Sequence, residues 1–155
     1  MPNYIWQIKP NISKQMRYNL FIGRYQSPHK GHMQLFNSFL QENKPVLIAI
    51  RDINPDMDNP LTATEVKGLW ETVYQNNPLV KVIVIPDIAS VNYGRGVGYE
   101  VNQLQVPDTI ASISATAIRK QILEGQTDWK EMVDSSIHEK LVSLLQAKQN
   151  EPGDG

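Results

Sequence analysis

The sequence predicts an α/β fold, with a doubly wound parallel sheet in a single domain and further helices at its C-terminal end. Three short runs of consecutive apolar residues alternate with segments whose apolar residues recur at helical spacing. Consecutive apolar residues are typical of strands that are buried on both faces, as in a parallel sheet. Strands that alternate with helices give right-handed crossovers and this fold class. The length of 155 residues fits one domain.

The three apolar runs predict strands at 18–23, 45–50 and 80–85. The first helix is expected at 31–43, where one stripe contains Met33, Phe36, Phe39 and Leu40. A second helix is expected at 62–75, with Val66, Leu69 and Val73 on one stripe. Thr62 and Glu65 have the spacing of a capping box, which predicts that this helix begins at Thr62.

Two more helices are expected near the C-terminus, at 114–124 and 135–147, the latter with Ile137, Leu141, Leu144 and Leu145 in register. Residues 1–17 contain Lys9, Lys14 and Arg17 without an acidic residue, which indicates a weakly cationic arm. The expected organisation is an arm at 1–17, a folded domain at 18–148 and a flexible tail at 149–155.

The composition excludes several classes of function. The chain contains no cysteine, which excludes disulfides, thiolate zinc sites and a cysteine nucleophile. A net charge of -1 argues against a broad nucleic-acid-binding surface. No apolar run approaches the roughly 20 residues of a membrane helix, and the N-terminal segment has no apolar signal region. We therefore expect a cytoplasmic protein with neither a nucleic-acid nor a membrane partner.

The loop after the first predicted strand reads GRYQSPHKGH and contains two of the three histidines of the chain, His29 and His32. Ligands of open α/β sheets bind beyond the carboxyl ends of strands, where helix N-termini favour anions. Arg24 and Lys30 add two cations, and Gly31 allows the backbone to approach a ligand closely. Two imidazoles on one face of a first helical turn can both donate to one phosphoryl group.

Two other interpretations of this loop remain open. Histidines three residues apart can share a metal ion, but no acidic residue lies between Arg17 and Glu42 to supply a third ligand. An acid-free, cation-rich loop attracts phosphate rather than a metal. The second interpretation is that this is an ordinary surface loop that contains histidines without a function.

A second candidate site lies at the start of the helix expected at 114–124. Ser114 and Thr116 bring hydroxyl groups to this helix start, and Arg119 and Lys120 follow one turn later. Capping by Ser114 and ordinary surface charge explain the pattern without a function. A helix N-terminus with hydroxyls and an arginine is also a site for a polyphosphate. Two phosphate sites on one sheet suggest a nucleoside triphosphate.

The two segments together resemble the paired signatures of the HxGH nucleotidyltransferase superfamily. Gly23–His32 (the first motif loop) matches the H-x-G-H signature, and Ile113–Arg119 (the second motif, ISATAIR) matches I-S-x-T-x-I-R. The first motif loop most resembles G-R-F-Q-P-F-H-x-G-H of archaeal-type nicotinamide-nucleotide adenylyltransferases. Asn59–Glu65 (NPLTATE) likewise resembles their N-P-F-T-x-x-E-R. The resemblance extends from about Leu20 to Ala147 and implies a Rossmann-like fold.

The chain departs from this family at two places. Val66 stands where the N-P-F-T motif usually ends in arginine. The segment between Asp87 and Ser112 is shorter than in those adenylyltransferases, which build a further strand and much of the acceptor pocket there. That segment contains Asn92–Tyr99 (NYGRGVGY), which is either a tight glycine turn or part of an acceptor site.

The resemblance implies that an acceptor phosphate attacks the α-phosphorus of a nucleoside triphosphate and expels pyrophosphate. His29, His32 and Arg119 are the implied catalytic residues, with the histidines at the α- and β-phosphates and Arg119 at the β- and γ-phosphates. The other implied nucleotide or phosphate contacts are Gly23, Arg24, Tyr25, Lys30, Gly31, Ser114 and Thr116. The candidate acceptor contacts are Arg51, Tyr93 and Arg95, with Tyr93 as a stacking ring.

Magnesium (Mg²⁺) is the expected cofactor, bound mainly through substrate phosphates and water rather than by protein ligands. Trp70 and Trp129 lie in helical stripes and are expected in the core.

Three functions remain open from the sequence. The leading one is adenylyl transfer from ATP to nicotinamide mononucleotide, which gives NAD. The second is cytidylyl transfer, or transfer to another small phosphorylated acceptor. The third is a nucleotide-binding regulatory module without turnover. A homo-oligomer, in which the arm at 1–17 contacts another subunit or covers the sheet edge, is a further expectation.

Overall fold

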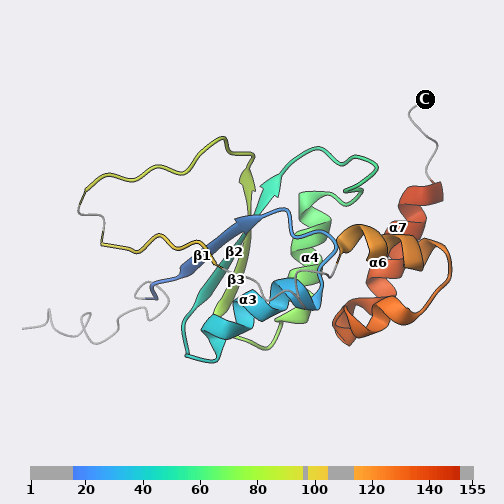
Figure 1. Cartoon of the computed structure of the whole chain (residues 1–155), viewed down its shortest axis with the longest axis horizontal. Coiled ribbons are helices and arrows are strands. Elements are labelled where there is room, and N and C mark those ends of the chain that lie inside the picture. Colours follow the sequence, from blue (N-terminus) through green and yellow to red (C-terminus); the bar gives the residue numbers. More distant parts are fainter. Residues whose placement is uncertain (1–15, 96–97, 105–113, 151–155) are drawn as a thin grey trace, which may run out of the picture.

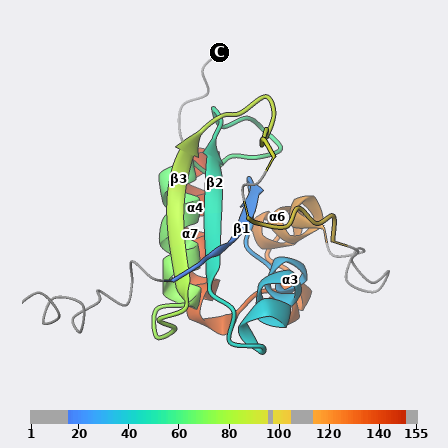
Figure 2. The same ribbon diagram turned by 90° about the vertical axis from the view of Figure 1, so that its left-hand side faces the viewer.

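A computed structural model describes residues 16–95, 98–104 and 114–150 of the chain. It contains a parallel sheet with the strand order β1-β2-β3 (Figures 1 and 2). The strands are β1 (Asn19–Gly23), β2 (Val46–Asp52) and β3 (Val80–Pro86). All three predicted strands are therefore confirmed, each within two residues of its expected ends. Three parallel strands side by side in sequence order correspond to one half of a doubly wound sheet, which agrees with the predicted α/β class.

Helices connect successive strands, as the alternating pattern predicted. Helix α3 (Lys30–Leu40) joins β1 to β2, and helix α4 (Ala63–Val73) joins β2 to β3. The capping box at the start of α4 is confirmed: the Thr62 side chain accepts from the Glu65 backbone N–H, and the Glu65 side chain accepts from that of Thr62. The crossovers place the N-termini of both helices at the carboxyl end of the sheet.

The register of the sheet shows where the core lies. Phe21, Ile48 and Val82 stand level across the three strands, and all three are buried. One position earlier, Leu20 of β1 is 54% exposed and Lys81 of β3 is exposed. The Phe21 ring packs edge-on against rings of α3, so the buried face is the one that the helices cover.

The C-terminal helices pack on the rest of the domain. Helix α6 (Ala115–Leu123) is followed by short 3-10 helices at Asp128–Glu131 and Ser135–Ile137 and then by α7 (His138–Asn150). Trp70 and Trp129 are 0% and 2% exposed, which confirms that both belong to the core. Helix α7 extends two residues into the segment that was expected to be a tail.

The described part of the segment after β3, 87–95 and 98–104, forms neither a helix nor a strand. Five of its large hydrophobic residues are exposed: Val91, Tyr93, Tyr99, Val101 and Leu104. Among the described residues, no helix has the length and apolar character needed to cross a membrane. Most of the arm at 1–17 and of the tail lies outside the described residues.

Candidate active site

The first motif loop turns sharply where β1 ends. A Cβ atom on Gly23 would lie 2.9 Å from the Tyr25 ring, so the chain needs a glycine there. Tyr25 itself has a φ of 50°, in the left-handed region. This turn brings the Tyr25 ring back under the loop and directs the chain toward the start of α3.

The two histidines of the first motif loop cap helix α3 and each other. His29 is the N-cap, and its Nδ1 accepts hydrogen bonds from the backbone N–H groups of Gly31 (3.0 Å) and His32 (3.4 Å). In return, the Nδ1 of His32 accepts from the His29 backbone N–H at 3.3 Å. The rings stack with their centroids 3.7 Å apart. The pattern is a capping box in which histidines replace the usual hydroxyl and carboxylate.

These contacts determine which nitrogen of each neutral ring carries the proton, and burial keeps both rings neutral. A nitrogen that accepts a hydrogen bond carries no proton, so each neutral ring has its proton on Nε2. Burial lowers the pKa of His29 to about 4, and burial with the charge of His29 lowers that of His32 to about 3. At neutral pH the pair therefore offers two uncharged Nε2–H donors rather than the cations that the sequence allowed.

An aromatic group supports His32. The ring of Tyr25 meets the rings of His32 and Phe36 edge-on at 5.2 and 5.3 Å, and Trp70 lies 5.7 Å from His32. The Trp70 indole N–H also donates to the Tyr25 carbonyl at 3.3 Å. Burial raises the pKa of Tyr25 to about 12, so its phenol stays neutral. Among the predicted site residues, Tyr25 is thus placed where it fixes the His32 ring.

The described part of the second motif begins at Ser114; Ile113 lies outside the described residues. Ser114 is the N-cap of α6, as predicted, and its Oγ accepts from the Ala117 N–H at 3.2 Å. Thr116 is exposed beside it in the first turn. Arg119 donates to the Met57 carbonyl and lies 3.9 Å from an Asp58 carboxylate oxygen. Hydroxyl and guanidinium groups of this kind are common anion ligands in proteins.

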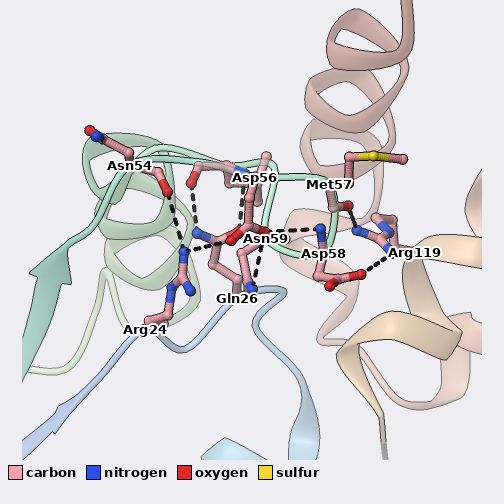
Figure 3. Close-up of polar contacts among 9 residues, drawn as sticks. Arg24, Gln26, Asn54, Asp56, Met57, Asp58, Asn59 and Arg119 are labelled. Carbon is pink, nitrogen blue, oxygen red and sulfur yellow. Dashed lines mark hydrogen bonds and ion pairs between the residues drawn. The ribbon is translucent and has the colours of Figure 1, made fainter.

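Residues 53–62 (the β2–α4 loop) connect the two motifs, as Figure 3 shows. On the side of the first motif loop, Arg24 donates to the Asn54 carbonyl at 3.5 Å and lies 3.9 Å from Asp56. On the other side, the same loop contacts Arg119 through Met57 and Asp58. The structure therefore brings Arg24 and Arg119, 95 positions apart in the sequence, to one loop.

The acidic residues of this loop did not appear among the sequence candidates, and neither did Gln26. Asp56 and Asp58 follow β2 closely, and the carboxyl ends of parallel strands meet at one edge of a sheet. That rule could have placed both carboxylates near the first motif loop. Gln26 lies inside the motif itself, but nothing in its neighbours indicates what its amide would contact.

The structure separates the remaining candidates. Lys30 is exposed at the start of α3, where its backbone N–H donates to Met132 at 2.7 Å, and Gly31 is buried in the first turn. Arg51 donates to Asp87 from both Nε (3.1 Å) and Nη2 (2.7 Å), which joins the ends of β2 and β3. Hydrogen bonds from Arg51 lower the pKa of Asp87, so this pair is charged at neutral pH.

Tyr93 and Arg95 are exposed in the segment after β3. The Tyr93 ring lies 6.0 Å from that of Tyr99. Figure 1 shows the chain after β3 extending away from α6 and then, at 98–104, running back toward the sheet. The role of Tyr93 and Arg95 as acceptor contacts stays a prediction.

Within the described ranges, no group of three or more histidine, aspartate or glutamate side chains has the arrangement of a metal site. The potential metal ligands at the two motifs are His29 and His32, whose Nδ1 atoms already accept hydrogen bonds, and the exposed carboxylates of Asp56 and Asp58.

No protein-family model matches the chain. Three curated relatives are archaeal proteins named nicotinamide-nucleotide adenylyltransferase. That of Pyrobaculum arsenaticum is 28% identical over 84% of this chain and 90% of its own length. That of Methanocorpusculum labreanum is 27% identical over 79% and 88%, and that of Pyrococcus furiosus is 25% identical over 83% and 85%. Over about four fifths of its length the chain is thus similar to archaeal nicotinamide-nucleotide adenylyltransferases, which confirms the resemblance that its two motifs indicated.

Proposed function

We propose that this protein is a nucleotidyltransferase that transfers the adenylyl group of ATP to nicotinamide mononucleotide, which gives NAD and pyrophosphate. The observation that carries the proposal is the joining of the two motifs by one loop, with His29 and His32 on one side and Arg119 on the other. The similarity to proteins named for this activity supports the same reaction.

The reaction needs alignment and charge stabilisation rather than a protein nucleophile. An oxygen of the acceptor phosphate bonds to the α-phosphorus, and the bond from that phosphorus to the bridging oxygen of pyrophosphate breaks. Because the acceptor phosphate is already ionised, no protein base has to remove a proton. The Nε2–H groups of His29 and His32 donate to the α- and β-phosphates, where charge develops in the transition state.

The second motif binds the far end of the triphosphate. Arg119 contributes a bidentate cation, and Ser114 and Thr116 contribute hydroxyls at the positive end of α6. Arg24 and Lys30 are the remaining cations of the first motif loop and contact the triphosphate or the acceptor. Arg51, Tyr93 and Arg95 remain the candidate acceptor contacts.

Mg²⁺ is part of this proposal as a partner of the nucleotide. The cation-rich motifs provide no carboxylate cage, so the ion binds through phosphate oxygens and water and neutralises part of their charge. ATP hydrogen-bonds to the histidines and Arg119 through its remaining phosphate oxygens.

Pyrophosphate release tests the function. The purified protein is incubated with Mg²⁺ and either ATP or CTP, against nicotinamide mononucleotide, phosphopantetheine, glycerol 3-phosphate and sugar phosphates. We expect pyrophosphate and NAD from ATP with nicotinamide mononucleotide and from no other pair. Turnover that requires CTP would make the protein a cytidylyltransferase, and ATP binding without pyrophosphate release would make it a regulatory module.

A further inference from the structure

Gln26 in the first motif loop makes a two-point contact with the backbone of Leu61. Its Nε2 donates to the Leu61 carbonyl at 2.6 Å, and its Oε1 accepts from the Leu61 N–H at 3.0 Å. Leu61 is 0% exposed. Buried backbone groups need hydrogen-bond partners, and an amide side chain offers both a donor and an acceptor. Gln26 thereby fixes one end of the β2–α4 loop to the first motif loop.

The β2–α4 loop transmits this fixed position because it has internal structure. The Asp56 carboxylate accepts from the backbone N–H groups of Asp58 (2.9 Å) and Asn59 (2.7 Å). The Asp56 N–H donates in turn to the Asn59 carbonyl at 3.0 Å. Hydrogen bonds from Asn59 and Asp58 lower the pKa of Asp56, so its carboxylate stays charged and keeps these bonds at neutral pH. Only Pro60 separates this hydrogen-bonded turn from Leu61 in the chain.

The tip of the same loop contacts Arg119 of the second motif. The Met57 carbonyl accepts from the Arg119 guanidinium, whose side chain is 16% exposed. The path from Gln26 through Leu61 and the Asp56 turn to Arg119 is visible in Figure 3, except for Leu61, which is not labelled. A shift of Leu61 therefore changes where the guanidinium lies relative to His29 and His32.

We propose that Gln26 is a positioning residue for nucleotide binding: its amide fixes the β2–α4 loop to the first motif loop, and the loop places Arg119 for the triphosphate. The inference rests on the proposed function in that it takes Arg119 as a nucleotide contact. Gln26 itself does not touch the reacting atoms. Its effect reaches the nucleotide through Arg119.

The variant Gln26→Met tests this, because methionine keeps the length of the side chain and removes both hydrogen bonds. The dissociation constant (Kd) of Mg²⁺-ATP is measured by titration calorimetry, and the KM for each substrate is measured where turnover occurs. We expect the Kd for ATP to rise about tenfold, the change expected for roughly 1.4 kcal/mol, while the KM for the acceptor changes less than twofold. Gln75→Met, the same substitution at an exposed position after α4, should leave both constants unchanged.

A double-mutant cycle separates positioning from general damage. If Gln26 acts through Arg119, Gln26→Met should change the Kd for ATP less than twofold in a protein that already contains Arg119→Ala. Gln26→Asn keeps the amide on a side chain that is one methylene shorter, so it cannot make both hydrogen bonds to Leu61, and its effect on the Kd should likewise disappear in the Arg119→Ala background. It provides the test if Gln26→Met does not fold. Fold-changes that multiply in the double variants would overturn the proposal, as would an unchanged Kd in folded Gln26→Met.

Failure of the proposed function has a different signature. A wild-type protein that binds ATP and forms no NAD would refute adenylyl transfer. The double-mutant cycle of Gln26 and Arg119 would still test the positioning role, because it measures ATP binding and not turnover. A wild-type protein that does not bind ATP would refute both.

Discussion

His29 and His32 are uncharged at neutral pH because they are buried, and their mutual capping leaves the proton of each ring on Nε2. The sequence predicted where they lie, at the start of a helix after the first strand, because motif and helix start are local features. It did not predict their charge, because the lowered pKa values depend on packing near Phe36 and Trp70. A neutral imidazole with its proton on Nε2 still has one N–H that can donate to a phosphoryl oxygen.

Substitutions of His32 separate its role in capping α3 from its proposed contact with a phosphate. We expect His32→Ala to lower kcat about a hundredfold or more, the range seen when one donor to a transition state is removed. His32→Asn keeps an acceptor near the His29 N–H but cannot reach as far as Nε2, so it should restore stability without restoring kcat. The measurements are steady-state kinetics and urea unfolding. An Ala variant with wild-type turnover would exclude a phosphate role for His32.

The same histidines predict how stability depends on pH. Their pKa values in the folded protein, about 4 and about 3, lie below the ordinary 6.5, so between these values the unfolded chain binds more protons. The free energy of unfolding should therefore be independent of these groups above pH 6.5. It should fall as the pH drops toward 4, by about 1.4 kcal/mol per pH unit for each histidine.

Urea unfolding of the wild type and His32→Asn at pH 8, 7, 5.5 and 4.5 measures this slope. Between pH 6.5 and 4.5, the variant should lose about half of the pH dependence that the two histidines give to the free energy of unfolding. Equal slopes in the two proteins would show that other groups cause the acid sensitivity. For the same reason, titration of these histidines should cause no change in kcat/KM between pH 6 and 8.

At the scale of elements, the β2–α4 loop brings carboxylates close to both motif arginines. Asp58 lies 3.9 Å from Arg119, and Asp56 lies 3.9 Å from Arg24. Under the proposed function, the triphosphate would have to compete with these carboxylates for the same guanidinium groups. The capping box that ends this loop was predictable from four consecutive residues, whereas these ion pairs join segments that are far apart in the sequence.

Removal of the competing charge should favour the nucleotide. We expect Asp58→Asn to lower the KM for ATP by up to about threefold at low salt, since exposed ion pairs contribute little, with the difference disappearing as salt is raised. Glu71→Gln removes an exposed carboxylate of the Lys67 ion pair on α4 and is the matched control. A raised KM in Asp58→Asn would instead mean that this carboxylate orients Arg119.

At the scale of the whole molecule, the fold was more predictable than the site. Strand and helix positions follow from local apolar patterns, and the parallel direction of the strands follows from the helices that connect them, so both were available from the sequence. The support of His32 by Tyr25 and Trp70 and the link from Gln26 to Leu61 depend on side chains that meet only after folding. The candidate site is thus assembled from the first motif loop at the start of α3, the β2–α4 loop and α6, which lie in three separate parts of the chain.

A nucleotide that contacts all three parts should stabilise the domain as a unit. A ligand at 100 times its Kd adds about 2.7 kcal/mol to a two-state protein, which corresponds to a rise in Tm of roughly 5–10 °C at this size. Differential scanning calorimetry with Mg²⁺-ATP should show one transition shifted upward as a whole, and AMP should shift it less. Arg119→Ala should reduce the shift with ATP and leave the small shift with AMP unchanged, because AMP lacks the phosphates assigned to Arg119. Equal shifts with ATP and AMP would place the γ-phosphate away from α6, and two separated transitions would show that the C-terminal helices unfold independently of the sheet.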